Sequence, residues 1–285
     1  MSGMGEGSDF AATTGETAER GDLTGRSDWR YDMNDKMEHE VRQPQRLARI
    51  AGVLYLLVGL TGGFAEGFVY PKMYVAGDAA ATTANVMANP GLVRLGVVSD
   101  LVDQTLFVFL VLTLYLLLQH VHKGVARAMV VLVVLAAAIT SLNAVFEFAG
   151  LQVATGAVNL SALGTAGANG IVLLLLDTQH YGLLIAQVFF GLWLIPLGYL
   201  AYQSKGMFPK WLGVLLIVGG VCYLVDLLAA FLVPDFGQTI HAFIVIPSAI
   251  AEIWMVGYLL VFGVRSPRPT DRAPMASPGQ VALTP

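Results

Sequence analysis

Long apolar segments alternate with short polar ones through the central part of the chain. A hydrocarbon core of about 30 Å requires about 20 apolar residues in helical form. Five segments meet this requirement: Leu47–Val69, Leu92–Leu118, Ala126–Phe148, Leu212–Val233 and Ala242–Val264. The pattern therefore predicts a polytopic helical membrane protein.

A sixth apolar segment, residues 171–203, is about 50 Å long as one straight helix, which exceeds a single span. The polar run 177–180, followed by Gly182, predicts a break and a new helix start. We place the span at Tyr181–Tyr202 and expect Ile171–Leu176 to be a short segment at the outer surface or re-entering the membrane. The predicted fold is an all-α membrane bundle of six transmembrane helices.

The first two spans are joined by a loop with helix signals of its own. Asp78 is a good N-cap for residues 79–87, and Asn89-Pro90 ends that run. We therefore predict a short interfacial helix on the outer side after the first span. Gly59, Gly63 and Gly67 are spaced for close helix contact, and packing inside the bundle is favoured over a dimer interface.

Composition supports a membrane protein and separates it from its tails. The chain is 56% hydrophobic and 13% charged, so a soluble fold of 285 residues has too little interior for its apolar surface. Residues 1–40 hold ten acids, four bases and no apolar run. We expect 1–44 to be a disordered acidic tail, 45–265 the six-helix domain, and 266–285 a disordered Pro-rich tail.

Basic residues beside the spans predict the orientation, because cytoplasmic loops are enriched in Lys and Arg. Arg42, Arg46 and Arg49 precede the first span, and the outer loops contain only Lys72 and Arg94. The remaining bases that flank spans are Lys123, Arg127, Lys205, Lys210, Arg265, Arg268 and Arg272. Both termini are therefore expected in the cytoplasm, with the chain in a bacterial cytoplasmic membrane.

Several functions find no support in the sequence. The single Cys222 excludes an intramolecular disulfide, and a net charge of −4 does not suggest nucleic-acid binding. No span contains a lysine for a retinal Schiff base, and the nucleotide-binding, serine-hydrolase and His-Glu-x-x-His motifs are absent. No cofactor is strongly implied, and the lipid bilayer is the one partner the composition requires.

Polar side chains recur within the predicted spans, where ionisable groups are rare and mark candidate functional sites. All but Glu252 are expected in the outer half, and helical spacing places them on stripes that we expect to face an acidic ligand-binding cavity. The candidate site residues are Glu66, Asp100, Asp103, Asn143, Glu147, His180, Gln187, Asp226 and Glu252, with Gln104 and His241 nearby.

The six acids of this set have no Lys or Arg within the spans except Arg94 at an outer mouth. They cannot all stay ionised in a low-dielectric bundle, so protons, a bound cation, histidine or water must neutralise some of them. Asp100 and Asp103 form the strongest pair, because acids one turn apart repel. A purely structural or solvated role for Glu66, Glu147, Asp226, Asn143 and His241 stays open.

Several stretches resemble a known family. These are Arg46-Leu-Ala-Arg-Ile-Ala-Gly-Val-Leu-Tyr55, Gly77-Asp-Ala-Ala-Ala-Thr82, Phe189-Phe-Gly-Leu192 and Tyr223-Leu-Val-Asp226. Over about residues 46–264 the chain resembles DUF4386, a family of bacterial integral membrane proteins. The resemblance implies a multi-pass protein of unknown function and supplies no catalytic residues.

Three classes of function remain. The acidic residues favour binding or transport of a cation, a proton or a cationic small molecule. A membrane-embedded metal-dependent hydrolase that uses His180, His241 and carboxylates is an alternative, although an enzyme is the less favoured class. A sensor or partner subunit, with protein partners unknown, is the third.

Overall fold

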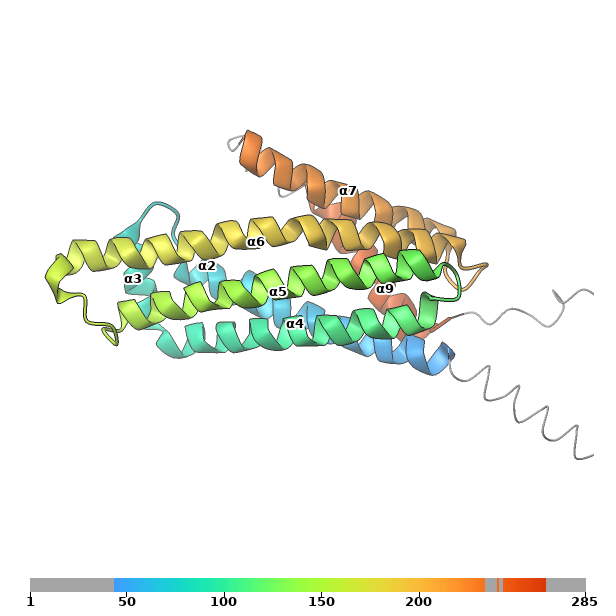
Figure 1. The fold of residues 1–285 in the computed structure, drawn as a ribbon, viewed down its shortest axis with the longest axis horizontal. Helices are drawn as coiled ribbons and strands as arrows, with labels where there is room; N and C mark the ends of the chain where they lie inside the picture. The colour runs from blue at the N-terminus through green and yellow to red at the C-terminus, as the bar shows by residue number, and fades with distance from the viewer. Residues whose placement is uncertain (1–43, 234–239, 241–242, 265–285) are drawn as a thin grey trace, which may run out of the picture. The chain divides into compact units, whose positions relative to one another are not determined.

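The computed structural model describes residues 44–233, 240 and 243–264, and every element within these ranges is helical (Figure 1). The first helix, Pro44–Met73, changes near its end to the π-helix η1, Gly63–Val69, and continues as α2, Tyr70–Met73. The other elements are α3 (Ala79–Ala88), α4 (Pro90–Leu118), α5 (Lys123–Ala154), η2 (Ser161–Leu163), α6 (Gly164–Gln203), α7 (Lys210–Leu232) and α9 (Ile246–Val261).

Five of these helices are long and apolar enough to cross a membrane: Pro44–Met73, α4, α5, α7 and the segment Ser161–Gln203 that contains α6. The chain is therefore a multi-pass membrane protein. The predicted sixth span, Ala242–Val264, corresponds to α9, which has 16 residues and a length of about 24 Å. Both predicted tails fall almost wholly outside the described residues, as do Arg42 and His241.

The predicted break before Tyr181 is wrong. α6 continues through residues 177–180 without interruption and reaches 40 residues, or about 60 Å. The polar side chains that suggested a break are accommodated in the helix: Thr178 Oγ1 donates to the carbonyl of Leu174 (2.7 Å), and Asp177 accepts a hydrogen bond from Tyr74 (2.6 Å). Residues 171–176 are therefore part of α6.

The short helix predicted in the first loop is confirmed as α3. Asp78 caps it, because its Oδ1 accepts a hydrogen bond from the Ala81 N–H at 2.9 Å. α3 packs against α6, α5, α4 and α2, so the loop that follows the first helix is folded onto the bundle.

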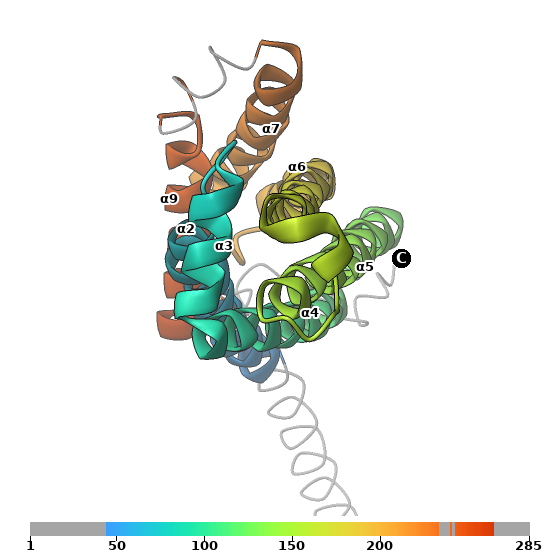
Figure 2. The same ribbon diagram turned by 90° about the vertical axis from the view of Figure 1, so that its left-hand side faces the viewer.

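Neighbouring helices pack in a closed order within residues 47–264. α4 lies against α5, α5 against α6, α6 against α7, and α7 against α9 (Figure 2). The first helix closes the ring, since η1 contacts α4 and a Cβ on Gly52 would come within 2.9 Å of the Leu260 nitrogen on α9. The polar stripes predicted on separate helices are thus brought around one interior.

Glycines allow the closest helix contact at the α6–α7 crossing and not in the first helix. A Cβ on Gly198 would lie 2.5 Å from the Gly213 carbonyl oxygen, and one on Gly213 would lie 2.7 Å from that of Gly198. Among the described residues, nothing lies within 4 Å of a Cβ built on Gly59, Gly63 or Gly67. The predicted inward packing of those three glycines is therefore wrong, because they lie on the exposed side of the helix.

Two apolar clusters fill the interior, one toward each end. The first apolar cluster contains Tyr55, Phe107 and Trp193, with the Trp193 ring 5.9 Å from Tyr55 and 5.0 Å from Phe107, and it extends to Met207 and Val264. The second apolar cluster consists of Val69, Met73, Val86, Val93, Leu151, Val172 and Leu176. The helices carry their polar residues between these two clusters.

Candidate functional site

A polar layer lies between the two apolar clusters. Along α4, Asp100, Asp103 and Gln104 fall between Val93 of the second cluster and Phe107 of the first, and each is more than nine-tenths buried. The same order holds on the first helix, α5 and α6. The layer contains Thr61, Glu66, Asp100, Asp103, Gln104, Thr140, Asn143, Glu147, Gln179, His180 and Gln187.

Four of the six predicted acids gather in this layer, and we call Glu66, Asp100, Asp103 and Glu147 the acidic cluster. Glu66 is close enough to the other three to interact with each electrostatically, and Glu147 interacts with Asp100. Glu147 is only 2% exposed. Carboxylates that interact with one another in a bundle interior cannot all be ionised without a compensating positive charge.

Asp103 is held in place by groups from two helices. Thr61 Oγ1 on the first helix donates to Asp103 Oδ1 at 2.8 Å, and Gln104 Nε2 donates to Oδ2 at 2.9 Å. A Cβ on Gly62 would come within 3.3 Å of Oδ1, so a glycine at this position lets the first helix approach the carboxylate. Both oxygens of Asp103 are thus oriented by donors and fixed relative to the first helix.

Glu66 lies in the middle of η1. A π-helix is rare, and where one occurs inside an α-helix it frequently marks a functional site. The wider helical turn changes the direction in which later side chains point, so Glu66 and Tyr70 do not follow the spacing that a regular α-helix would give. The sequence pattern showed Glu66 but contained no signal for this local geometry.

The polar layer also holds buried polar atoms that lack a hydrogen-bond partner among the described residues. Gln104 Oε1 is the clearest case, since this side chain is 4% exposed and its amide nitrogen is bonded to Asp103. Natural proteins pair nearly all such groups, because leaving one unpaired costs about 1–3 kcal/mol. The others in the layer are Thr140 Oγ1, Asn143 Nδ2, Gln179 Oε1 and Gln187 Oε1, and the hydroxyl of Tyr70, beside the layer, is a sixth such atom.

Aromatic rings surround the end of the layer nearest α3. His180 stacks on Tyr70 and Tyr74, with ring centroids 6.1 and 5.6 Å away, and the two tyrosines stack on each other at 5.2 Å. Tyr70 links these rings to the acidic cluster, because it interacts electrostatically with Glu66 and Glu147. Burial and the hydrogen bond to Asp177 raise the pKa of the Tyr74 hydroxyl, so this group stays a donor.

Glu252 has hydrogen-bond partners outside the acidic cluster. Glu252 on α9 accepts hydrogen bonds from Tyr55 (2.9 Å) and Tyr223 (3.5 Å), and Tyr55 precedes Glu66 by about 16 Å of helix. Asp226 is buried on α7, one turn from Tyr223. Electrostatic interactions therefore link four of the six predicted acids, and a shared site that includes Glu252 and Asp226 stays a prediction.

The remaining predicted residues lie on α5 and α6. Asn143 on α5 packs against Gly182 of α6. Gln187 lies farther along α6 and is partly buried. Sequence reasoning missed Thr61, Tyr70, Tyr74 and Gln179 as members of the site. The spacing of Tyr70 and Tyr74, four residues apart where the first helix ends, was the available signal for the aromatic group.

No group of three or more His, Cys, Asp or Glu side chains close enough to hold a metal ion occurs in the part of the chain that the structure describes. The described carboxylates of the acidic cluster therefore form no site with three protein ligands for one metal ion. The predicted metal site with His180 gains no support, and His241 lies outside the described residues.

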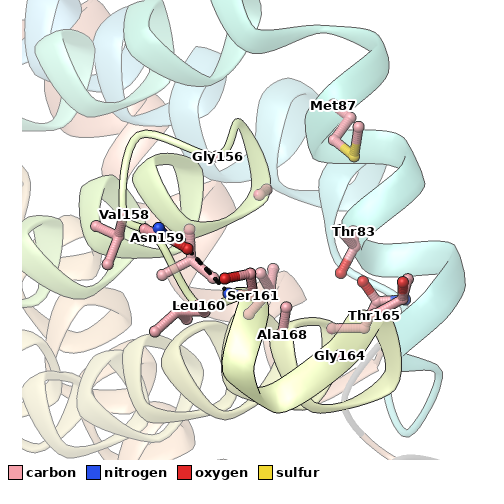
Figure 3. A pocket seen from close by; sticks show the side chains of 14 residues that line it. Thr83, Met87, Gly156, Val158, Asn159, Leu160, Ser161, Gly164, Thr165 and Ala168 are labelled. Atoms are coloured by element: carbon pink, nitrogen blue, oxygen red, sulfur yellow. Dashed lines mark hydrogen bonds between the residues drawn. The ribbon is translucent and has the colours of Figure 1, made fainter.

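A separate pocket of about 660 Å³ lies beside the turn between α5 and α6 (Figure 3). Thr83 and Met87 of α3 line one side, and Asn159 and Ser161 line another, where the Ser161 N–H donates to Asn159 Oδ1 at 3.1 Å. None of the predicted site residues borders this pocket, and none of its lining side chains is charged.

Comparisons with known proteins identify a family and assign no activity. A family model described as "Domain of unknown function (DUF4386)" matches residues 50–263. An uncharacterized protein of Archaeoglobus fulgidus is 36% identical over 75 residues, which cover 23% of this chain and 46% of that protein. The chain thus spans about half the length of this curated relative. No solved structure matches the chain.

Proposed function

This chain belongs to the DUF4386 family, whose description assigns no function, and we propose that it binds a cation in the acidic cluster as a step in cation transport. The observation that carries the proposal is the position of four carboxylates in a polar layer enclosed by two apolar clusters. A bound cation neutralises carboxylates that otherwise repel in a low-dielectric interior. An anionic substrate has the wrong charge for this site.

We further propose a six-span topology with both termini on the cytoplasmic side of a bacterial membrane, and tails that lie outside the helical domain. Five of the basic residues in the described part of residues 47–264 support the orientation, because they lie at the end where the α4–α5 and α6–α7 turns are found: Arg49, Lys123, Arg127, Lys205 and Lys210 (Figure 1). Lys72 and Arg94 lie at the opposite end. α9 completes the count as the sixth span.

A transport role fits the location of the layer along the helices. Phe107 and Trp193 close one side of it, and Val69, Val93 and Leu176 close the other. A cation held by the acidic cluster is thereby separated from both membrane surfaces, which is the arrangement expected of a carrier with a central binding site.

The proposal is tested by cation-dependent stabilisation of the purified full-length protein. We expect at least one member of a panel of Na⁺, K⁺, Mg²⁺ and organic ammonium ions to raise the Tm of the wild type, because a ligand that binds only the folded state stabilises it. The Asp100→Asn/Asp103→Asn variant should lose this rise. Uptake of the same ion into vesicles then tests transport.

Asp78→Asn is the matched control. It makes the same substitution once, at the exposed N-cap of α3, and Asn caps a helix as well as Asp does, so its response should equal that of the wild type. A response of the double variant equal to the wild type, or no response to any cation, contradicts the proposal. If the double variant does not fold, each single variant is measured in its place.

A further inference from the structure

The carboxylates of the acidic cluster are spread along the helix axis. Asp103 lies beside Thr61 and Gly62 of the first helix. Glu147 lies beside Gly96 of α4, because a Cβ built on Gly96 would be 3.4 Å from Glu147 Oε1 and 2.9 Å from Val69. Gly96 precedes Asp103 by two turns of α4, about 10 Å of helix. The site therefore has an inner end at Asp103 and an outer end at Glu147.

A single small ion cannot neutralise both ends at once. No three acidic groups are close enough to share one metal ion among the residues described, and the α4 positions that mark the two levels, Gly96 and Asp103, are about 10 Å apart along the helix. Four interacting carboxylates, three of them buried, also call for more than one positive charge. Both constraints are met by one elongated cation with a charge near each end.

The unpaired polar atoms indicate that this cation carries N–H donors. Five of the six are oxygen atoms, and the three glutamine oxygens among them only accept hydrogen bonds. The three glutamine oxygens lie on α4 and α6, as expected for a ligand that donates hydrogen bonds at several places. Protonated amines have such donors, whereas quaternary ammonium ions have none.

The aromatic rings at the outer end suit the carbon chain of such a ligand. Tyr70, Tyr74 and His180 present stacked rings beside the carboxylate of Asp177. Aromatic faces attract cations as well as alkyl groups. A cation that enters past α3 would meet these rings before it reaches Glu66 and Glu147.

We infer that the ligand of the acidic cluster is a linear organic cation with two or more protonated amines, held at one end by Asp103 and Asp100 and at the other by Glu147 and Glu66. This inference rests on the proposed function and specifies its ligand. Hydrogen bonds from the ammonium groups to the unpaired oxygens, including Gln104 Oε1 of the polar layer and the Tyr70 hydroxyl beside it, complete the site.

Calorimetric titration of the purified full-length protein tests the inference with 1,4-diaminobutane, spermidine, n-butylamine, tetramethylammonium and NaCl at one pH and ionic strength. We expect the diamine or the triamine to bind at least about 10-fold more tightly than n-butylamine, because it forms charge-assisted hydrogen bonds at both ends. Tetramethylammonium, which has no N–H donor, should bind more weakly than n-butylamine.

Two single variants locate the ends of the ligand. Asp103→Asn and Glu147→Gln should each weaken binding of the tighter polyamine about 10-fold or more, whereas n-butylamine should be sensitive to one of them at most. Tyr70→Phe removes a buried hydroxyl without a described partner, so it should keep the protein stable while it lowers polyamine affinity. This variant tests the site even if a carboxylate variant does not fold.

The possible failures are distinguishable. If Na⁺ or n-butylamine binds as tightly as the polyamines, or if only one carboxylate variant affects polyamine binding, this inference is wrong and cation binding survives. If none of these cations binds the wild-type protein, this inference is wrong. If K⁺ and Mg²⁺ also give no stabilisation, the proposed function is wrong as well.

Discussion

At the scale of single residues, Glu252 shows how hydrogen-bond donors hold a buried carboxyl group in place. Its two oxygens accept hydrogen bonds from tyrosines on two other helices, Tyr55 at 2.9 Å and Tyr223 at 3.5 Å. Hydrogen bonds to a charged acceptor are stronger than neutral ones. Glu252 therefore joins the first helix, α7 and α9, and we assign it a structural role.

The prediction for this group is that Tyr55→Phe lowers the free energy of unfolding by about 1–3 kcal/mol, because it removes a donor from a buried acceptor. Tyr199→Phe is the control, since Tyr199 is 38% exposed and its ring contact with His122 survives the change. Both are measured by reversible unfolding in mixed detergent.

A double-mutant cycle with Glu252→Gln provides the stricter measurement. We expect the loss caused by Tyr55→Phe to be smaller in the Glu252→Gln background, since the two side chains interact directly. Additive losses in the cycle would show that the hydrogen bond contributes nothing to stability.

The members of the acidic cluster were predictable one by one, and their partners were not. Asp100, Asp103 and Glu147 stand out in apolar segments, and their spacing places them on inward stripes. Thr61 and Gln179 look ordinary in the sequence, because any helix contains such residues. Their roles arise from packing between the first helix, α4 and α6, which one-dimensional spacing does not specify.

At the scale of elements, the α6–α7 contact depends on glycines that bring the backbones together. Gly198 faces Gly213, and Gly191 faces Gly220, where a Cβ on Gly220 would lie 2.6 Å from the Gly191 carbonyl oxygen. The two pairs are two turns apart along α6. Small residues at this spacing are the usual means of close helix approach in membranes.

We predict that Gly198→Ala destabilises the protein by about 1–3 kcal/mol, because the added methyl group meets backbone atoms that can move only if the helices separate. Gly59→Ala is matched in chemistry but has open space around it, so it should be neutral or stabilising by up to about 1 kcal/mol. Thermal unfolding of the two variants gives the comparison. Equal destabilisation of both would contradict the interface.

Element boundaries were predictable where local signals decide them. Asp78 specifies the start of α3 through its own side chain, and the structure agrees. The expected break before Tyr181 failed because Asp177 finds a partner in Tyr74, more than a hundred residues earlier. The polarity of residues 177–180 alone does not indicate that the hydroxyl of Tyr74 will donate a hydrogen bond to the Asp177 carboxylate.

At the scale of the whole molecule, the proposed topology predicts which sites are accessible from outside the cell. Cys222 is the single cysteine, so a Cys222→Ser background permits labelling at chosen positions. In intact cells a membrane-impermeant maleimide should label Asp78→Cys, on the loop before α3, and should leave Lys123→Cys, at the start of α5, unlabelled. Permeabilised cells should label both. The opposite pattern would reverse the orientation.

The polar residues of α4 have a consequence for how the chain enters the bilayer. Asp100, Asp103 and Gln104 lie near the middle of a 29-residue helix, and an aspartate at that depth opposes insertion by about 2.5–3.5 kcal/mol. Thr61, which donates to Asp103, is synthesised before α4. The first helix can therefore remain next to the translocon until α4 emerges and can then bind the polar side chains of α4. We expect the two helices to enter the lipid bilayer together.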